Sequence, residues 1–320
     1  MKNKNGVMSV KAIIEKITEQ IQEGIYPGAS LALYRNGQWS EHYLGLADPE
    51  KGEPVVADLV YDLASVSKVV GVATICAFLY AKGELALDRP FKELYPRFAH
   101  EKTTIRELLT HTSGLDPFIP NRDHLDARQL KTALENLQLK EDKSFHYTDV
   151  NFLLLGFWLE DRFHQPLDRL FEELIFTPWK MTETRFGPVE KAVPTVRGVA
   201  SGSVHDPKAR VLGCHAGSAG LFSTVADLER FLEHYLKDDF ARDLSQNFAR
   251  EEGKTRALGW NLEDDWLDHT GYTGTFIMYN RKRQEAVIFL SNRTYEKDER
   301  AQWILDRNSL MDLIKQECEK

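Results

Sequence analysis

Residues 65–81 constrain the fold of this chain most strongly. The spacing predicts a helix whose apolar side chains point to nearly every side, among them Val69, Val70, Val72, Ile75, Phe78 and Leu79. A helix that is hydrophobic all round has to be buried, so we expect a central helix of the core. Its first turn carries Ser65 and Lys68, which share one helical face. We therefore expect Ser65 and Lys68 to lie at the N-terminal end of a rigid, buried helix.

The pair has the composition of a nucleophile and its activator. Lys68 can reach back toward the Ser65 oxygen, and a lysine can act as a base for a serine when burial lowers its pKa. The positive end of a helix also favours an anion that develops there. Taken alone, Ser-x-x-Lys is an ordinary helix start, so the interpretation depends on the rest of the chain.

The remaining pattern predicts two blocks of different character. Residues 10–21 repeat at helical spacing and stop at Gly24, and strands are expected at 29–34 and 39–46 around the turn signal Asn36-Gly37. Residues 85–236 are mostly helical. Within them, Thr104 with Glu107 is typical of a capping box, and Thr224 with Asp227 indicates another helix start. After residue 256, strands are expected at 257–261, 273–281 and 285–291, followed by a helix at 299–318.

This order indicates an α+β fold in one domain of 320 residues. We expect the two ends of the chain to share one antiparallel sheet flanked by the terminal helices. This α/β lobe would comprise about residues 1–64 and 240–320, and a mostly helical lobe would comprise about 65–239. A pocket where two such lobes meet is a common place for a ligand.

Composition excludes several classes of function. The net charge is -8 without any basic block, which argues against nucleic acid or a membrane surface as partner. We find no apolar signal segment near the N-terminus and no apolar run long enough to span a bilayer, which favours a cytoplasmic protein. His111, His146, His205 and His215 lack metal-site spacing, so we expect neither a metal nor another cofactor.

Two further motifs accompany the Ser-Lys pair. Residues 145–151 form a polar turn before a helix and contain Tyr147 and Asp149, and residues 269–274, which begin His269-Thr270-Gly271, are predicted to open a strand. Together the three stretches resemble the SxxK, Tyr-x-Asn and Lys/His-Thr-Gly signatures of the serine β-lactamase and penicillin-binding protein superfamily. The resemblance is strongest to the class C-like branch, which includes D,D-peptidases, D-aminopeptidases and carboxylesterases. It covers about residues 20–295, and residues 109–115 and 217–224 are additional matching loops.

The resemblance implies a β-lactamase/transpeptidase-like fold and a role for each motif. Ser65 would attack the substrate carbonyl and form an acyl-enzyme, Lys68 would accept or relay its proton, and Tyr147 would assist as base or acid. The backbone amides of Ser65 and Tyr272 would form the oxyanion hole. His269, Thr270 and Gly271 would line the substrate pocket, as would Asp149.

Two departures from the family pattern favour an esterase-like hydrolase. Asp149 stands where Asn is usual in the class C branch, and a carboxylate accepts but does not donate hydrogen bonds. It would also favour the ammonium form of Lys68, which shifts work to Tyr147. His269 replaces a lysine and weakens the fixed positive charge that suits a β-lactam or D-alanyl carboxylate. Asp149 has an equally acceptable interpretation as the N-cap of the following helix.

The sequence therefore predicts a cofactor-free serine hydrolase for a small ester, amide or peptide substrate. The first alternative is a D,D-carboxypeptidase, a D-aminopeptidase or a weak β-lactamase. The second, from another class, is a catalytically silent binding module on the same fold. Trp158, Trp179 and Phe222 are expected in the core.

Overall fold

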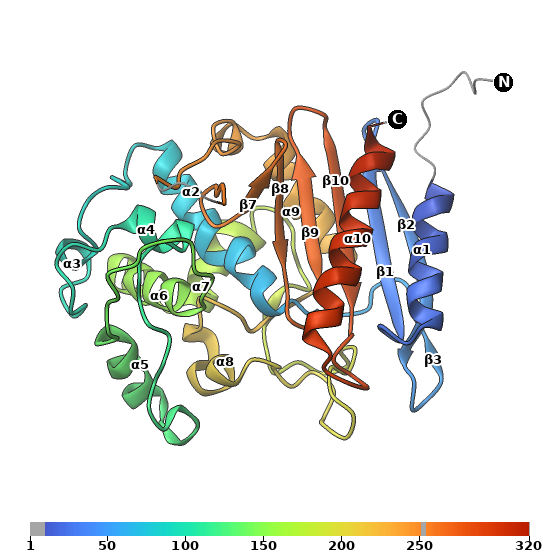
Figure 1. The fold of residues 1–320 in the computed structure, drawn as a ribbon, viewed down its shortest axis with the longest axis horizontal. Coiled ribbons are helices and arrows are strands. Elements are labelled where there is room, and N and C mark those ends of the chain that lie inside the picture. Colours follow the sequence, from blue (N-terminus) through green and yellow to red (C-terminus); the bar gives the residue numbers. More distant parts are fainter. Residues whose placement is uncertain (1–9, 251–253, 320) are drawn as a thin grey trace.

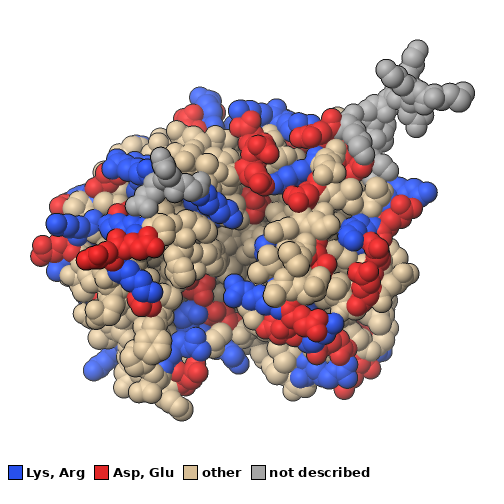
Figure 2. All heavy atoms as spheres, viewed as in Figure 1, with Lys and Arg blue, Asp and Glu red and all other residues tan. Residues whose placement is uncertain are grey.

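The computed structural model of the chain describes residues 10–250 and 254–319. The N-terminal stretch in which we expect no signal segment lies outside these residues. Figure 1 shows a sheet with helices on both faces beside a block of helices and loops. The face drawn in Figure 2 carries basic and acidic side chains interspersed, and it is hollowed between these two parts.

The two ends of the chain share one antiparallel sheet, as the sequence predicts. The strand order is β3-β2-β1-β10-β9-β8-β7, and β1 pairs with β10 so that Ala29 lies opposite Ser291. Asn36 and Gly37 both have positive φ, which fits the predicted tight turn between the first two strands. The strands are β1 (Gly28–Arg35), β2 (Gln38–Asp48), β3 (Glu53–Pro54), β7 (Asn261–Glu263), β8 (Trp266–Thr270), β9 (Phe276–Asn280) and β10 (Glu285–Ser291).

Helices bury both faces of this sheet. The terminal helices α1 (Val10–Gln22) and α10 (Arg300–Cys318) pack against each other on one face. On that side Val287 and Phe289 of β10 join a cluster with Ile13 and Trp303. The alternate residues of β10 point to the opposite face, where α9 (Val225–Lys237) contacts β1, β9 and β10. The lobe boundaries stay a prediction, although α9, which we expected in the helical lobe, packs on the sheet.

The central apolar segment is helical and buried, as predicted. It starts with a 3-10 turn (Ala64–Val66), continues through a π-helical stretch (Val69–Ala73) and ends in α2 (Thr74–Ala81). By length and composition residues 64–81 could cross a membrane, which corrects our statement that no run is long enough. In the fold 78% of this window is buried inside the protein, so its apolar character is explained by its place in the core.

The other helices surround this segment and bury Trp158, Trp179 and Phe222 as expected. Predicted caps are confirmed, since Thr104 and Glu107 form a reciprocal capping box and Thr224 accepts from the amide of Asp227. These elements are α3 (Phe91–Leu94), α4 (Ile105–Thr110), α5 (Ala127–Glu135), α6 (Val150–Phe163), α7 (Leu167–Phe171) with a π-helical continuation (Glu172–Phe176), and α8 (Pro207–Leu212). Three short 3-10 turns lie at Arg122–His124, Gly213–His215 and Asp239–Ala241, and a small sheet joins β4 (Tyr61–Asp62), β6 (Leu221–Ser223) and β5 (Arg185–Phe186).

Two strand predictions near the third motif were wrong. Residues 257–260 are not a strand, because their apolar side chains, such as Trp260, fill the core from an irregular segment. The first strand of this region is instead β7, which begins at Asn261 and forms a hairpin with β8. The third motif closes β8 instead of opening a strand, since residues 271–275 turn before β9 begins at Phe276. Gly274 has φ +107 there, a conformation that L side chains rarely adopt.

Candidate active site

Lys68 lies at the centre of the site and uses all three of its N–H donors. Its Nζ donates to Ser65 Oγ at 2.8 Å, to Asp149 Oδ1 at 2.7 Å and to the Ser218 carbonyl at 3.0 Å. The side chain is 0% exposed. The helical spacing that predicted contact between Ser65 and Lys68 is therefore confirmed. An ammonium group supplies these three bonds, whereas a neutral amine has one donor fewer.

The charges around Lys68 favour that ammonium form. Burial acts to lower the pKa of Lys68, but the Asp149 carboxylate and the Tyr147 hydroxyl outweigh burial and raise the pKa above its ordinary value. Burial acts to raise the pKa of Asp149, but Lys68 and Lys208 hold it well below its ordinary value. Lys68 and Asp149 thus form an ion pair at neutral pH, which is the direction expected from the sequence.

Asp149 does not cap α6 with its side chain. It occupies the N-cap position but makes no capping hydrogen bond. Its carboxylate, 25% exposed, instead reaches Lys68 through Oδ1 and Lys208 through Oδ2. Of the two interpretations left open by the sequence, the structure supports a place in the site and contradicts a capping role.

Tyr147 lies over Lys68 on the open side of the site. Its ring centroid is 5.1 Å from Lys68 Nζ and 4.6 Å from the His111 ring, and the residue is 38% exposed. Buried His111 also contacts the Asn151 amide, and Ser113 donates to Asn151 at 2.8 Å. The loop at 109–115 therefore supports the second motif, a function that sequence reasoning did not assign to it.

Two threonines that follow the His269-Thr270-Gly271 motif form hydrogen bonds with the backbone just before Ser65. Thr273 Oγ1 donates to the Asp62 carbonyl at 2.8 Å, and Thr275 Oγ1 donates to the Leu63 carbonyl at 3.0 Å. A Cβ on Gly271 would lie 2.6 Å from that Leu63 oxygen. Glycine is thus required for this close approach, which brings Tyr272 beside Ser65.

Ser65 and Tyr272 border two cavities together. One of 230 Å³ also includes Tyr147, His269, Thr270 and Gly271. The other, of 520 Å³, includes Asp149 and Lys208. Neither the Ser65 amide nor the Tyr272 amide donates a hydrogen bond to another described residue. Both are therefore free to donate to a substrate oxygen. Every predicted site residue except the buried Lys68 lines one of these two cavities, and Lys68 contacts Ser65 and Asp149 from beneath.

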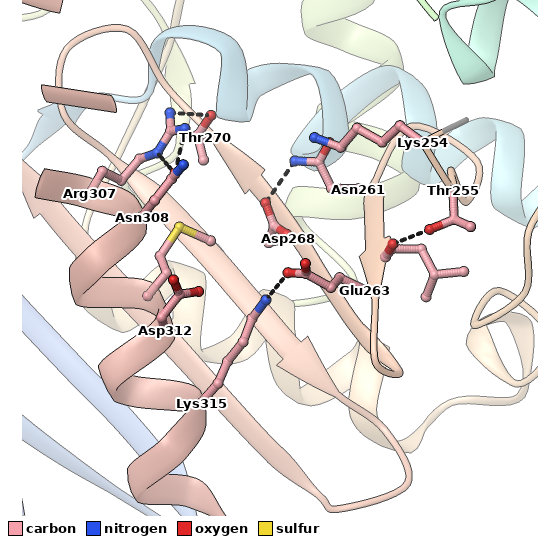
Figure 3. Close-up of a pocket in the computed structure, with 12 residues that line it drawn as sticks. Lys254, Thr255, Asn261, Glu263, Asp268, Thr270, Arg307, Asn308, Asp312 and Lys315 are labelled. Carbon is pink, nitrogen blue, oxygen red and sulfur yellow. Dashed lines mark hydrogen bonds and ion pairs between the residues drawn. The ribbon is translucent and has the colours of Figure 1, made fainter. Parts of the chain in front are cut away.

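A third cavity of 480 Å³ continues behind Thr270 (Figure 3). It lies between α10 and the hairpin β7–β8, and Arg307 reaches from α10 to donate to Thr270 Oγ1 at 3.1 Å. Among the described residues, neither Arg307 nor Lys254 has a carboxylate within ion-pair distance. Asp268 accepts from the Asn261 amide at 2.7 Å on the opposite wall.

Sequence reasoning missed the basic residues of the site. Lys208, Lys254, Arg300 and Arg307 all line cavities that adjoin the three motifs. They lie in a short helix, a loop and α10, and none of them belongs to a motif. No spacing in the sequence connects them to Ser65. No group of three or more His, Cys, Asp or Glu side chains in the described part of the chain is arranged to hold a metal ion.

His269 brings no positive charge to the site at neutral pH. Burial, followed by the nearby Lys68 and Arg256, lowers the pKa of His269 well below its ordinary value. The neutral ring lies 6.1 Å from that of Tyr147, measured between centroids. This agrees with the expectation that the His-Thr-Gly motif lacks the fixed charge of a lysine.

This burial predicts a specific loss of stability in acid. Unfolded histidine titrates near pH 6.5, so below that pH the unfolded chain binds a proton that folded His269 does not. The stabilising contribution is complete above about pH 6.5 and declines as the pH falls. When the pH falls from 7.5 to 5.5, the unfolding free energy of wild type should therefore decrease by about 1.4 kcal/mol more than that of His269→Phe. Urea unfolding at both pH values measures this difference, and the exposed His146, changed to Phe, is the matched control. Equal losses in wild type and His269→Phe would contradict it.

Comparison with known proteins places these features in a family. The model of the Beta-lactamase family matches residues 13–310. A protein of Escherichia coli (strain K12) named "Putative D-alanyl-D-alanine carboxypeptidase" is 27% identical over 87% of this chain and 81% of its own length. A protein of the same name from Salmonella typhi is 25% identical over the same shares.

Solved structures share the fold at low identity. The Beta-Lactamase/D-Alanine Carboxypeptidase from Pseudomonas syringae superposes with a TM-score of 0.75 at 19% identity, covering 96% of this chain and 98% of the other. EstCE1, described as a hydrolase with promiscuous acyltransferase activity, gives a TM-score of 0.77 at 20% identity over 95% and 98%. These likenesses confirm the predicted fold class.

Proposed function

On the premise that this chain belongs to the Beta-lactamase family and is a serine hydrolase, we propose that it cleaves esters or small amides through an acyl-enzyme on Ser65. The observation that carries the proposal is the Ser65–Lys68–Asp149 arrangement, in which a buried ammonium donates to the nucleophile oxygen at 2.8 Å. An adjacent charge of this kind supports a serine as it becomes an alkoxide.

Each motif has a part in the proposed reaction. In the form of the site that has lost one proton, Tyr147 is a phenolate and Lys68 is an ammonium. Ser65 Oγ bonds to the substrate carbonyl carbon while its proton moves to the Tyr147 phenolate oxygen, and Lys68 remains an ammonium. The Ser65 and Tyr272 amides donate to the carbonyl oxygen as it becomes negative, and each donor of this kind contributes about 3 kcal/mol. Tyr147 then protonates the leaving oxygen or nitrogen, and a water molecule repeats the sequence to release the acid.

The proposed preference for esters follows from two side chains. Asp149, ionised beside two lysines, cannot donate a hydrogen bond to a substrate amide carbonyl. His269 stays neutral at the position where the family pattern carries a lysine. Both features reduce recognition of a peptide-like or β-lactam substrate. The similarity to EstCE1 and to relatives named as D-alanyl-D-alanine carboxypeptidases is compatible with either an ester or a peptide substrate.

One observation favours the alternative D,D-carboxypeptidase function. Arg307 and Lys254 line the pocket beside Thr270 without a carboxylate partner among the described residues (Figure 3). A half-buried guanidinium that donates only to neutral oxygens suits the carboxylate of a peptide terminus. The names of the curated relatives agree with this alternative.

A direct comparison of substrates separates the two functions. We expect a higher kcat/KM for 4-nitrophenyl butyrate than for release of D-alanine from a peptide ending in D-Ala-D-Ala, and weak labelling by a fluorescent penicillin. The reverse order of the two substrates, together with stoichiometric penicillin labelling, would establish the alternative. Failure of a fluorophosphonate probe to label the folded protein would instead support a silent binding module.

A further inference from the structure

Lys208 is a second lysine of the site, partly buried, that none of the three motifs contains. Its Nζ lies 3.0 Å from Asp149 Oδ2 and 3.5 Å from Asp206 Oδ2, and its side chain is 13% exposed. Lys68 occupies the other oxygen of Asp149 at 2.7 Å. One carboxylate is therefore held between two ammonium groups, and only one of them contacts the nucleophile.

The fold holds Lys208 in this place. Asp206 caps α8 by accepting from the Ala209 amide at 2.8 Å, and Pro207 occupies the first turn. Lys208 follows directly and lines the 520 Å³ cavity that also contains Ser65, Tyr147 and Asp149. A lysine side chain loses much rotamer freedom in such a position, and two carboxylates offset that cost.

The positive charge of Lys208 makes it easier to remove a proton from the groups around Lys68. The charged groups that face Lys68 are Asp149, from the turn before α6, and beyond it Lys208 and Asp206, from α8. The Tyr147 hydroxyl and the neutral rings of His111 and His269 also lie close enough to interact with Lys68. Arg256 lies over the Phe145 ring.

We propose that Lys208 is a positioning residue that neutralises the outer oxygen of Asp149 and so sets the pH at which the Ser65–Lys68–Tyr147 group loses its catalytic proton. Without it, the full charge of Asp149 acts on Lys68 and Tyr147 and makes the proton harder to remove. This inference rests on the proposed hydrolase function. It does not depend on which member of the group releases the proton, because these groups titrate as a coupled unit.

Two substitutions should move the pH dependence in opposite directions. Lys208→Met removes a positive charge, so the rise of kcat/KM with pH should shift upward by about one pH unit, which is about tenfold in rate at a fixed pH on the rising limb. Asp206→Asn keeps the helix cap but removes a negative charge, and it leaves Lys208 to Asp149 alone. The same limb should therefore shift downward, by less.

The experiment measures kcat/KM for 4-nitrophenyl butyrate against pH at low ionic strength, where charge effects are least screened. Lys208→Arg retains the charge and should restore a near wild-type profile. Arg210→Met is the matched control, since Arg210 is exposed on the same helix. Thermal unfolding of each variant at one pH separates folding defects from titration shifts, because lower stability alone reduces rate without moving the limb.

Unchanged limbs in both Lys208→Met and Asp206→Asn, or shifts in the same direction, would overturn the inference. A limb in Arg210→Met that moved as far as in Lys208→Met would do the same. These results are distinguishable from failure of the proposed function, because in that case wild type and Ser65→Ala would hydrolyse the ester equally and no profile of the variants would report on Ser65.

Discussion

Replacing Ser65 by alanine should lower kcat/KM for 4-nitrophenyl butyrate by about 10⁴-fold or more, as expected when the nucleophile of an acyl-transfer enzyme is removed. The residual rate would come from the oxyanion donors and from binding alone. Among the described residues, the Ser65 side chain has one hydrogen-bond partner, Lys68, so the variant should fold. Initial rates measured with equal amounts of folded protein test this prediction.

Ser67→Ala is the matched control in the same helical turn. Ser67 Oγ accepts from the Leu221 amide at 3.1 Å and lies in the core. Its removal leaves a buried N–H without an acceptor and should cost about 1–3 kcal/mol of stability, while the rate per folded molecule stays near that of wild type. Ester hydrolysis that survived in Ser65→Ala but disappeared in Ser67→Ala would contradict the assignment.

Replacing Lys68 by methionine should have the second largest effect, a loss of about 10³-fold or more in kcat/KM, because the charge that supports the Ser65 alkoxide disappears. It should also lower the free energy of unfolding by about 3 kcal/mol, since one side of a buried ion pair is lost. Rates and urea unfolding of the same preparation measure both quantities.

The double variant Lys68→Met/Asp149→Asn separates the two effects. Removal of the stranded carboxylate should recover part of the stability, because no uncompensated charge remains next to the methionine. Activity should not return, because the amide supplies no positive charge at Ser65. Recovery of activity together with stability would show that Lys68 has only a structural role.

Short-range sequence patterns correctly predicted several local features that hold the site in place. The contact between Ser65 and Lys68 follows from helical spacing, the β1–β2 turn from Asn36-Gly37, and the cap of α4 from Thr104 and Glu107. Each depends on residues a few positions apart, so the sequence alone contains the geometry. The sharing of one sheet by the chain ends was inferred from element order and is also confirmed.

Contacts between distant segments could not be predicted. Lys208 meets Asp149 across 59 residues of sequence, and Arg307 meets Thr270 across 37. Neither contact has a periodicity or motif that would indicate it. The side chain of Asp149 illustrates the same limit, because its N-cap position is a local property whereas its pairing with Lys68 is set by the fold. The wrong strand at 257–260 arose because burial of an irregular segment has the same apolar composition as a strand.

The most direct test of the central claim is the mass of the protein trapped during turnover. Wild type mixed with 4-nitrophenyl butyrate and quenched in acid should gain the mass of one butyryl group, and peptide mapping should place it on Ser65. The Ser65→Ala protein should gain none. A butyryl group on another residue, or an adduct of equal yield in Ser65→Ala, would contradict an acyl-enzyme formed at Ser65.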